Sequence, residues 1–177
     1  MENLEDKLFQ IPEGSYGADY KPNLLEQYKL YVEMADRISA RRQAANSFFL
    51  GINTALLGAL GFLFKSGGSE PSLGFVILLS TLGIVLDYAW YRLIRSYKDI
   101  NTAKFKVIHA LESKLPASPY DAEWAALGEG SNPKLYLPFT RIEIRIPWIF
   151  MSLYSFLIIY HLPISVCIGK VLTRCQV

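Results

Sequence analysis

The stretch LGIVLDYAWYRLIRSYK, residues 82–98, begins as an apolar run and ends among charged residues. It carries one carboxylate, Asp87, and the arginines and lysines that follow are separated from it by no proline or glycine. A helix that passes from lipid into water has this pattern, because aromatic and basic side chains gather where the span meets the headgroups. The stretch therefore predicts the end of a membrane span that continues as a helix in water.

Three apolar blocks of about twenty residues occur in the chain, and a helix of that length crosses a ~30 Å hydrocarbon core. Residues 46–64 and 72–86 contain no charged residue, and 146–167 contains only the titratable His161. Helices of a soluble bundle would keep a polar stripe for water, and these blocks have only a thin polar patch. The 177 residues therefore predict one all-α integral membrane domain, 1–177, with three transmembrane helices.

The basic residues predict the orientation of the chain. Six lysines and arginines precede the first block, one follows it, nine separate the second block from the third, and two follow the third. Because cytoplasmic flanks carry the excess of Lys and Arg, we expect a cytoplasmic N-terminus, an external turn at 66–71 and an external C-terminus. The net charge of +2 is too small to favour nucleic acid, whereas basic residues beside the spans favour anionic lipid headgroups.

The first two spans are predicted to extend into the cytoplasm as a long antiparallel helical hairpin. Residues 22–65 contain no proline after Pro22, and 72–115 contain none. Apolar side chains recur at helical spacing on both extensions: Leu24, Tyr28, Tyr31, Ala35 and Ile38 on the first, and Tyr97, Ile100, Lys104, Val107, Leu111 and Leu115 on the second. Pairing about the turn places Glu33 opposite Lys104, and Asp87 near Leu50 and Gly51.

The predicted organisation has six parts: an N-terminal tail at 1–21, a stalk helix with the first span at 22–65, the second span with its stalk helix at 72–115, a cytoplasmic loop at 116–139, the third span at 140–167 and an external tail at 168–177. Tyr120 and Trp124 are the candidate anchors that dock the loop-like stretch 116–135 on the stalk. Thr140 and Glu143 have the spacing of a capping box, although 141–146 also fits a short strand or an interfacial segment. Pro163 is expected to bend the third span.

Asp87 is predicted to lie about one helical turn inside the membrane boundary. A lone charge in lipid is costly and usually has a partner. The candidate partners are the juxtamembrane arginines Arg41, Arg42, Arg92 and Arg95. Two roles for Asp87 stay open. Either an ion pair fixes the helices at the boundary, or the Asp87 side chains of a subunit ring face a lumen and select cations.

Small residues recur on one face of the first span: Ser47, Gly51, Ala55, Gly58 and Ala59. Such faces let helix backbones approach closely in membranes. The face is expected to pack either on the second span of the same subunit or on a neighbouring subunit.

The sequence predicts no enzymatic activity, no cofactor and no metal site. His109 and His161 fall on opposite sides of the membrane in the predicted topology, and His109 is expected to be solvated. Cys167 and Cys175, if on one helix, lie beyond disulfide reach. Walker, dinucleotide-binding and HExxH motifs do not occur in the sequence.

Several stretches together resemble a known family: ADRISARRQAANSFFLGINTALLG at 35–58, YRLIRSYKDINTAKFKVIHALESKLP at 91–116, DAEW at 121–124 and YLPFTRIEIRIPWIF at 136–150. In order and spacing they resemble the RipA family of octameric bacterial membrane proteins. The arginine-rich entry and the NxAKFxVIxxLE stretch are also similar to the two-span SLATT membrane-effector domains, which are thought to form pores. The third span favours the RipA-like family. That resemblance implies an octameric ring in the bacterial inner membrane and brings no catalytic residues.

Two functions fit these observations. One is a ring-forming membrane protein that acts as a pore or a structural assembly. The other is a membrane anchor or adaptor that recruits a cytoplasmic partner through the stalk and loop 116–135.

Overall fold

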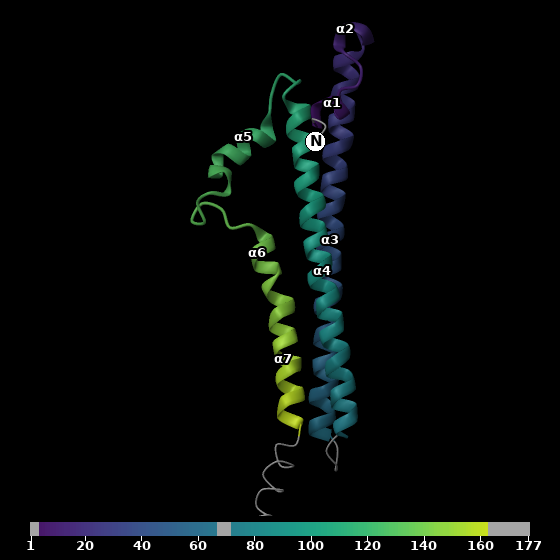
Figure 1. The fold of residues 1–177 in the computed structure, drawn as a ribbon, viewed down its shortest axis with the longest axis vertical. Helices are drawn as coiled ribbons and strands as arrows, with labels where there is room; N and C mark the ends of the chain where they lie inside the picture. Colours follow the sequence, from purple (N-terminus) through teal and green to yellow (C-terminus); the bar gives the residue numbers. More distant parts are fainter. Residues whose placement is uncertain (1–3, 67–71, 163–177) are drawn as a thin grey trace, which may run out of the picture. The chain divides into compact units, whose positions relative to one another are not determined.

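The computed structural model describes residues 4–66 and 72–162, and its regular elements there are all helical (Figure 1). These are α1 Leu4–Leu8, α2 Glu13–Tyr16, α3 Tyr20–Ser66, α4 Leu73–Glu112, α5 Pro119–Ala126, the short 3₁₀ helix η1 Gly128–Gly130, α6 Phe139–Glu143 and α7 Arg145–His161. Helix α3, helix α4 and the stretch Phe139–His161 are each long and apolar enough to cross a membrane. The predicted fold class, an all-α membrane protein with three candidate spans, is confirmed.

The chain forms two compact units that share α3 and α4. Unit 1 comprises residues 1–45 and 94–142, and unit 2 comprises 46–93 and 143–177. The division on α3 falls where the first apolar block begins, so unit 2 contains the apolar blocks and unit 1 contains the more polar remainder.

Helix α4 carries a continuous seven-residue repeat of buried and half-buried side chains: Val76, Ser80, Gly83, Asp87, Trp90, Ile94, Tyr97, Asn101, Lys104, Ile108 and Leu111. Spacings that alternate between four and three residues keep one face of a helix against a partner, as in a coiled coil. The predicted positions of Tyr97, Lys104 and Leu111 lie on this face. Ile100 does not lie on this face, because it is not one of the repeat positions and its side chain is exposed.

In unit 1, α3 and α4 run antiparallel. The Tyr28 hydroxyl of α3 donates a hydrogen bond to Glu112 of α4. The Lys104 ammonium of α4 lies 4.5 Å from the centre of the Tyr31 ring of α3. The predicted register is therefore two residues off at Lys104, and the predicted pairing of Glu33 with Lys104 is wrong. Glu33 instead accepts a hydrogen bond from Arg37, because a partner four residues along the same helix is reached without crossing to α4.

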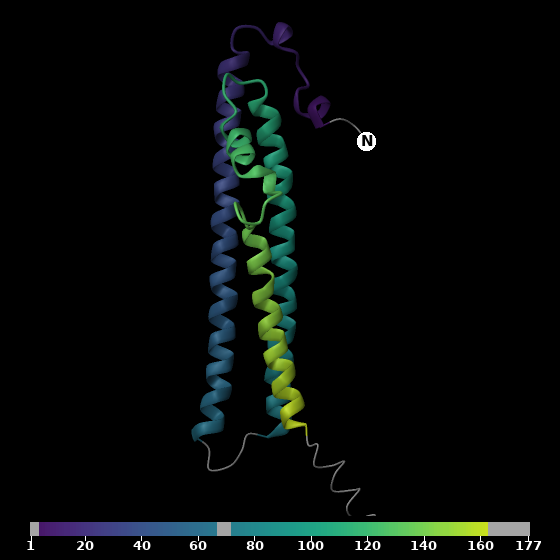
Figure 2. The same ribbon diagram turned by 90° about the vertical axis from the view of Figure 1, so that its left-hand side faces the viewer.

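In unit 2, α3, α4 and α7 run side by side (Figure 2). Aromatic rings of the three helices are in contact. The Trp90 ring of α4 stacks on Phe49 of α3 with centroids 5.6 Å apart, and it lies 6.4 Å from Phe150 of α7. Tyr154 of α7 is wholly buried and presses on Gly83 of α4, where a Cβ would lie 2.5 Å from the ring. The close approach of α7 to α4 therefore requires glycine at position 83.

The predicted capping box is wrong, and so is the alternative of a strand at 141–146. Helices α6 and α7 cover this stretch and meet at Ile144. The two side chains of the expected box are engaged by α3 instead: Thr140 Oγ1 accepts a hydrogen bond from Arg42, and Glu143 Oε1 accepts one from Asn46, each at 2.9 Å.

The stretch 116–135 is not a plain loop, since it contains α5 and η1. Tyr120 docks on α4, as predicted, with its ring 5.8 Å from that of Phe105. Trp124 packs instead on Tyr136, 6.1 Å away, in the segment that follows η1. Of the predicted turn at 66–71, residues 67–71 lie outside the described residues, as do the bend at Pro163, both cysteines and the tail 168–177.

Replacing Gly83 by alanine is expected to destabilise unit 2, because the new methyl group would collide with the Tyr154 ring. Overpacking of this kind costs typically about 1–3 kcal/mol. Gly74→Ala is the matched control, since nothing lies within 4 Å of a Cβ at that position of the same helix. Thermal unfolding in detergent should separate the two variants, and equal stability would contradict the close packing of α7 on α4.

Candidate functional site

Four polar side chains are wholly buried in the described part of the chain: Asn53, Ser80, Asp87 and Glu112. Buried polar groups normally have hydrogen-bond partners, so such residues reveal which contacts a fold depends on. Two of them are carboxylates, one in each unit, and neither is paired with a lysine or arginine among the described residues. Each carboxylate instead joins three segments by hydrogen bonds.

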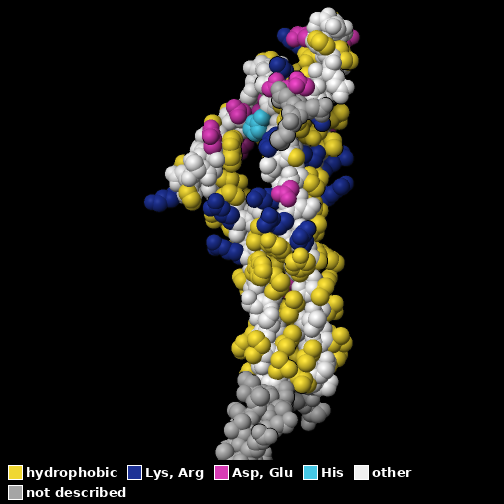
Figure 3. Space-filling model, in the orientation of Figure 1, with side chains coloured by type: hydrophobic (Ala, Val, Ile, Leu, Met, Phe, Trp, Pro, Cys, Tyr) yellow, Lys and Arg dark blue, Asp and Glu magenta, His cyan; other side chains and the backbone are white. Residues whose placement is uncertain are grey.

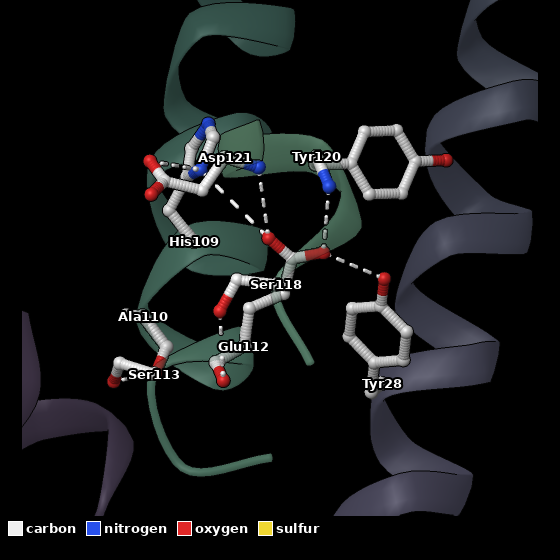
Figure 4. A network of polar contacts seen from close by, with 8 residues as sticks. All are labelled: Tyr28, His109, Ala110, Glu112, Ser113, Ser118, Tyr120 and Asp121. Atoms are coloured by element: carbon white, nitrogen blue, oxygen red, sulfur yellow. Dashed lines mark hydrogen bonds and ion pairs between the residues drawn. The ribbon is translucent and has the colours of Figure 1, made fainter. Parts of the chain in front are cut away.

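Glu112, the last residue of α4, joins α3, α4 and α5 in unit 1 (Figure 4). Its Oε1 accepts hydrogen bonds from the Tyr28 hydroxyl at 2.8 Å and from the Tyr120 amide at 3.0 Å. Its Oε2 accepts one from the Asp121 amide at 3.2 Å. Both amides belong to the first turn of α5, where Ser118 makes no side-chain cap. Glu112 therefore caps α5 from a neighbouring helix, and its charge is favourable at that helix N-terminus.

His109 lies in the same network and is not the solvated residue that its position in the sequence predicts. Its Nδ1 is 3.5 Å from a carboxylate oxygen of Asp121 and 3.9 Å from one of Glu112. The imidazole is half-buried, because α5 folds back beside it. A protonated His109 would add a positive charge between the two carboxylates.

The phenols that surround Glu112 resist ionisation. Burial raises the pKa of Tyr28 above its ordinary value, and the hydrogen bond and negative charge of Glu112 raise it further. Burial also raises the pKa of Tyr120, with smaller contributions from nearby carboxylates that include Asp36. Tyr28 is therefore a hydrogen-bond donor at neutral pH. Because the folded protein holds these protons more tightly than the unfolded chain, stability should fall as the pH rises above about 10, the ordinary pKa of a phenol.

Asp87 joins the three helices of unit 2. Its Oδ1 accepts a hydrogen bond from the Asn53 amide group of α3 at 2.8 Å, and Asn53 Oδ1 accepts one from the Tyr154 hydroxyl of α7 at 3.0 Å. All three side chains have an exposed fraction of 0%. Asp87 Oδ2 has no hydrogen-bond partner among the described residues, so the carboxylate is only partly satisfied.

The structure corrects the partner that we predicted for Asp87: it places Asn53 against the carboxylate, and no described arginine pairs with it. Arg92 lies five positions further along α4, on another side of the helix, and is exposed. Arg41 and Arg95 are exposed as well, and Arg42 donates to Thr140. The side chain of Asp87 points into its own subunit, so it does not offer an acidic group to a lumen.

A second polar layer of unit 2 lies nearer the start of the first apolar block. The Trp90 indole donates to Asn46 Oδ1 at 2.8 Å, and the Asn46 amide group donates to Glu143 at 2.9 Å. Asn46 and Asn53 are seven residues apart and therefore on one face of α3, a spacing that could have revealed both. Tyr154 carries no comparable signal in the sequence, because a tyrosine in an apolar span is ordinary.

The small-residue face of α3 is not covered by the described part of the chain. All five of its residues are exposed: Ser47, Gly51, Ala55, Gly58 and Ala59. Nothing lies within 4 Å of a Cβ added to either glycine. Of the two alternatives that the sequence leaves open, packing on the second span of the same subunit is not what the structure shows.

No metal centre accompanies these networks: residues 4–66 and 72–162 contain no group of three His, Cys, Asp or Glu side chains that could hold an ion. What both networks do is bind helices together.

Glu112→Ala is expected to release α5 from α4, because two amides and the Tyr28 hydroxyl lose their acceptor. Unsatisfied buried donors cost about 1–3 kcal/mol. Amide hydrogen exchange should accelerate in 119–126. Glu33→Ala is the control, since its exposed pair with Arg37 is worth only ~0.3–0.5 kcal/mol. Unchanged exchange in α5 of the Glu112→Ala variant would contradict the capping role.

Asn53→Leu is expected to lower the unfolding temperature of the detergent-solubilised protein, because Asp87 and Tyr154 both lose their partner. Asp87→Asn should be close to neutral. It keeps an oxygen for the Asn53 amide and removes an incompletely satisfied carboxylate from a buried position. If Asp87→Asn destabilises the protein as much as Asn53→Leu does, the carboxylate must have a further partner.

Comparison with known families gives one match over most of the chain. A family model described as the octameric membrane protein family (8xMP) matches residues 25–163, which covers α4, α5, α6, α7 and most of α3. No curated protein and no solved structure matches the chain. The resemblance to SLATT domains gains no support, whereas the predicted resemblance to octameric membrane proteins is confirmed. The chain belongs to the octameric membrane protein family.

Proposed function

We propose that the chain forms an octameric ring in the bacterial inner membrane, as a pore-like or structural assembly without enzymatic activity. The family supports a membrane-located homo-oligomer. The observation that carries the proposal further is the exposed small-residue face of α3. Small side chains make up most of this face, and such residues allow the backbone of a neighbouring subunit to approach closely.

The outward faces of the other two spans in unit 2 have a different character. Their exposed residues include large apolar side chains: Leu78 and Val85 on α4, and Ile149, Phe156 and Ile159 on α7. On the face drawn in Figure 3, unit 2 presents mainly hydrophobic side chains in the lower part of the view. We assign the surfaces of α4 and α7 to lipid and the small-residue face of α3 to the subunit contact. Phe48 and Phe62 are also exposed on α3, and in the proposed contact their rings would pack beside the glycines.

A pore made by such a ring would not owe ion selectivity to Asp87, since that carboxylate is enclosed in its own subunit. Thr54 carries an exposed hydroxyl group on α3 that is not among the five small residues, and this hydroxyl is the polar group that the span offers to a lumen. The distribution of basic residues supports a cytoplasmic N-terminus and an external C-terminus.

The second candidate function is a membrane adaptor. It is favoured by the α5–η1 segment, which Glu112 holds against α4 and which exposes Asp121, Glu123 and Trp124. A cytoplasmic protein with a basic, partly apolar surface would fit there.

The mass of the detergent-solubilised particle tests the ring. We expect the mass of eight chains for the wild type and smaller particles for Gly58→Leu, because the leucine would hold neighbouring backbones apart. Gly74→Leu is the control, with equally open space but on α4. A monomeric wild type would overturn the ring, and an intact Gly58→Leu octamer would exclude this face as the contact. Single-channel current in planar bilayers would then separate a pore from a structural ring.

A further inference from the structure

The segment between η1 and α7 exposes large apolar side chains before the third apolar block, and the last two of them, Phe139 and Ile142, belong to the beginning of the candidate span Phe139–His161. Leu135, Leu137, Phe139 and Ile142 are all exposed, with Phe139 at 71% and Leu135 at 62%. Single exposed apolar residues are ordinary on any protein surface. Four within eight consecutive residues instead indicate a surface that something covers.

A hydrogen bond fixes where α6 lies along α3. Arg42 of α3 donates to Thr140 of α6 at 2.9 Å, and both residues belong to unit 1. Arg42 precedes Asn46, where the first apolar block begins, by four residues, or about 6 Å of helix. Helix α6 therefore lies at the level where α3 enters its membrane-spanning part.

The exposed charges of this segment before Glu143 are positive, and Glu143 itself accepts a hydrogen bond from Asn46. Residues 131–142 contain Lys134 and Arg141 and no carboxylate. Both basic side chains are exposed, and neither is in an ion pair in the described part of the chain. A protein partner would have to supply both carboxylates and an apolar surface, whereas a bilayer with anionic headgroups supplies phosphate above its acyl chains.

We propose that residues 134–142 are an interfacial anchor that lies on a bilayer containing anionic phospholipid. Phe139 and its apolar neighbours enter the boundary between headgroups and acyl chains, and Lys134 and Arg141 contact phosphate. Short segments with apolar side chains beside basic ones bind membrane interfaces in this way, and each basic residue near an anionic surface adds to the attraction. The anchor would fix the membrane end of the segment that connects η1 to α7. It does not depend on the proposed ring.

The test uses the full chain with Cys167 and Cys175 replaced by serine and one new cysteine, labelled with an environment-sensitive fluorophore. Phe139→Cys is compared with Leu30→Cys, an exposed apolar position on α3 that lies twelve residues before Arg42. Both variants are reconstituted in phosphatidylcholine vesicles with or without phosphatidylglycerol, with a spin label high on the acyl chain of a tracer lipid. We expect the label at 139 to be blue-shifted and quenched severalfold more than the label at 30.

Quenching at 139 should be greater in the vesicles that contain phosphatidylglycerol. Lys134→Gln combined with Arg141→Gln should remove that difference. Equal quenching at positions 139 and 30 would overturn the anchor, and crosslinking between the Phe139→Cys residues of two subunits would assign the surface to a second copy of the chain instead. If the Phe139→Cys protein that keeps Lys134 and Arg141 is quenched equally in both kinds of vesicle, the recognition of anionic lipid is overturned. The particle mass of the same samples reports the number of chains, so the ring is tested separately from the anchor.

Discussion

The hydrogen bond between Asn53 and Asp87 is the contact on which the packing of unit 2 depends. Apolar side chains on two helices can interlock in several registers with similar energies. An amide and a carboxylate surrounded by hydrocarbon cannot, because each unpaired polar group there is costly. Tyr154 adds a third helix to the same constraint, since its hydroxyl donates a hydrogen bond to the amide oxygen of Asn53. Gly83 then allows the ring of that tyrosine to reach this depth.

Glu112 imposes a comparable constraint in unit 1 by different means. Its carboxylate is wholly buried, yet its partners are two amides of α5 and a phenol rather than a cation. Amide donors at a helix N-terminus are fixed in direction, so they specify where α5 must begin more narrowly than a flexible lysine would. The same carboxylate holds Tyr28, and therefore one charged group determines how α3, α4 and α5 meet. Removing it would affect all three together.

The features that were predictable from the sequence are those that depend on averages over many residues. The spans follow from the absence of charge, and the extents of α3 and α4 follow from Pro22 and from the lack of later helix breakers. The predictions were wrong where the result depends on which partner a single side chain contacts. Arginines near Asp87 in the sequence suggested an ion pair, but helix geometry turns Arg92 to another side. Helix α5 was missed because its cap, Glu112, lies outside the segment that it caps.

Enclosing the polar groups inside each subunit also limits what an assembly can do with them. The hydrogen bonds among Asp87, Asn53 and Tyr154 join the three helices of unit 2. These side chains could therefore line a passage only if the helices separated. The surfaces that remain for neighbours and lumen are the small-residue face of α3 and the large apolar faces of α4 and α7. In the ring that we propose, subunit contacts would therefore rest on shape and close backbone approach, and any conduction on the width of the opening and a few hydroxyl groups.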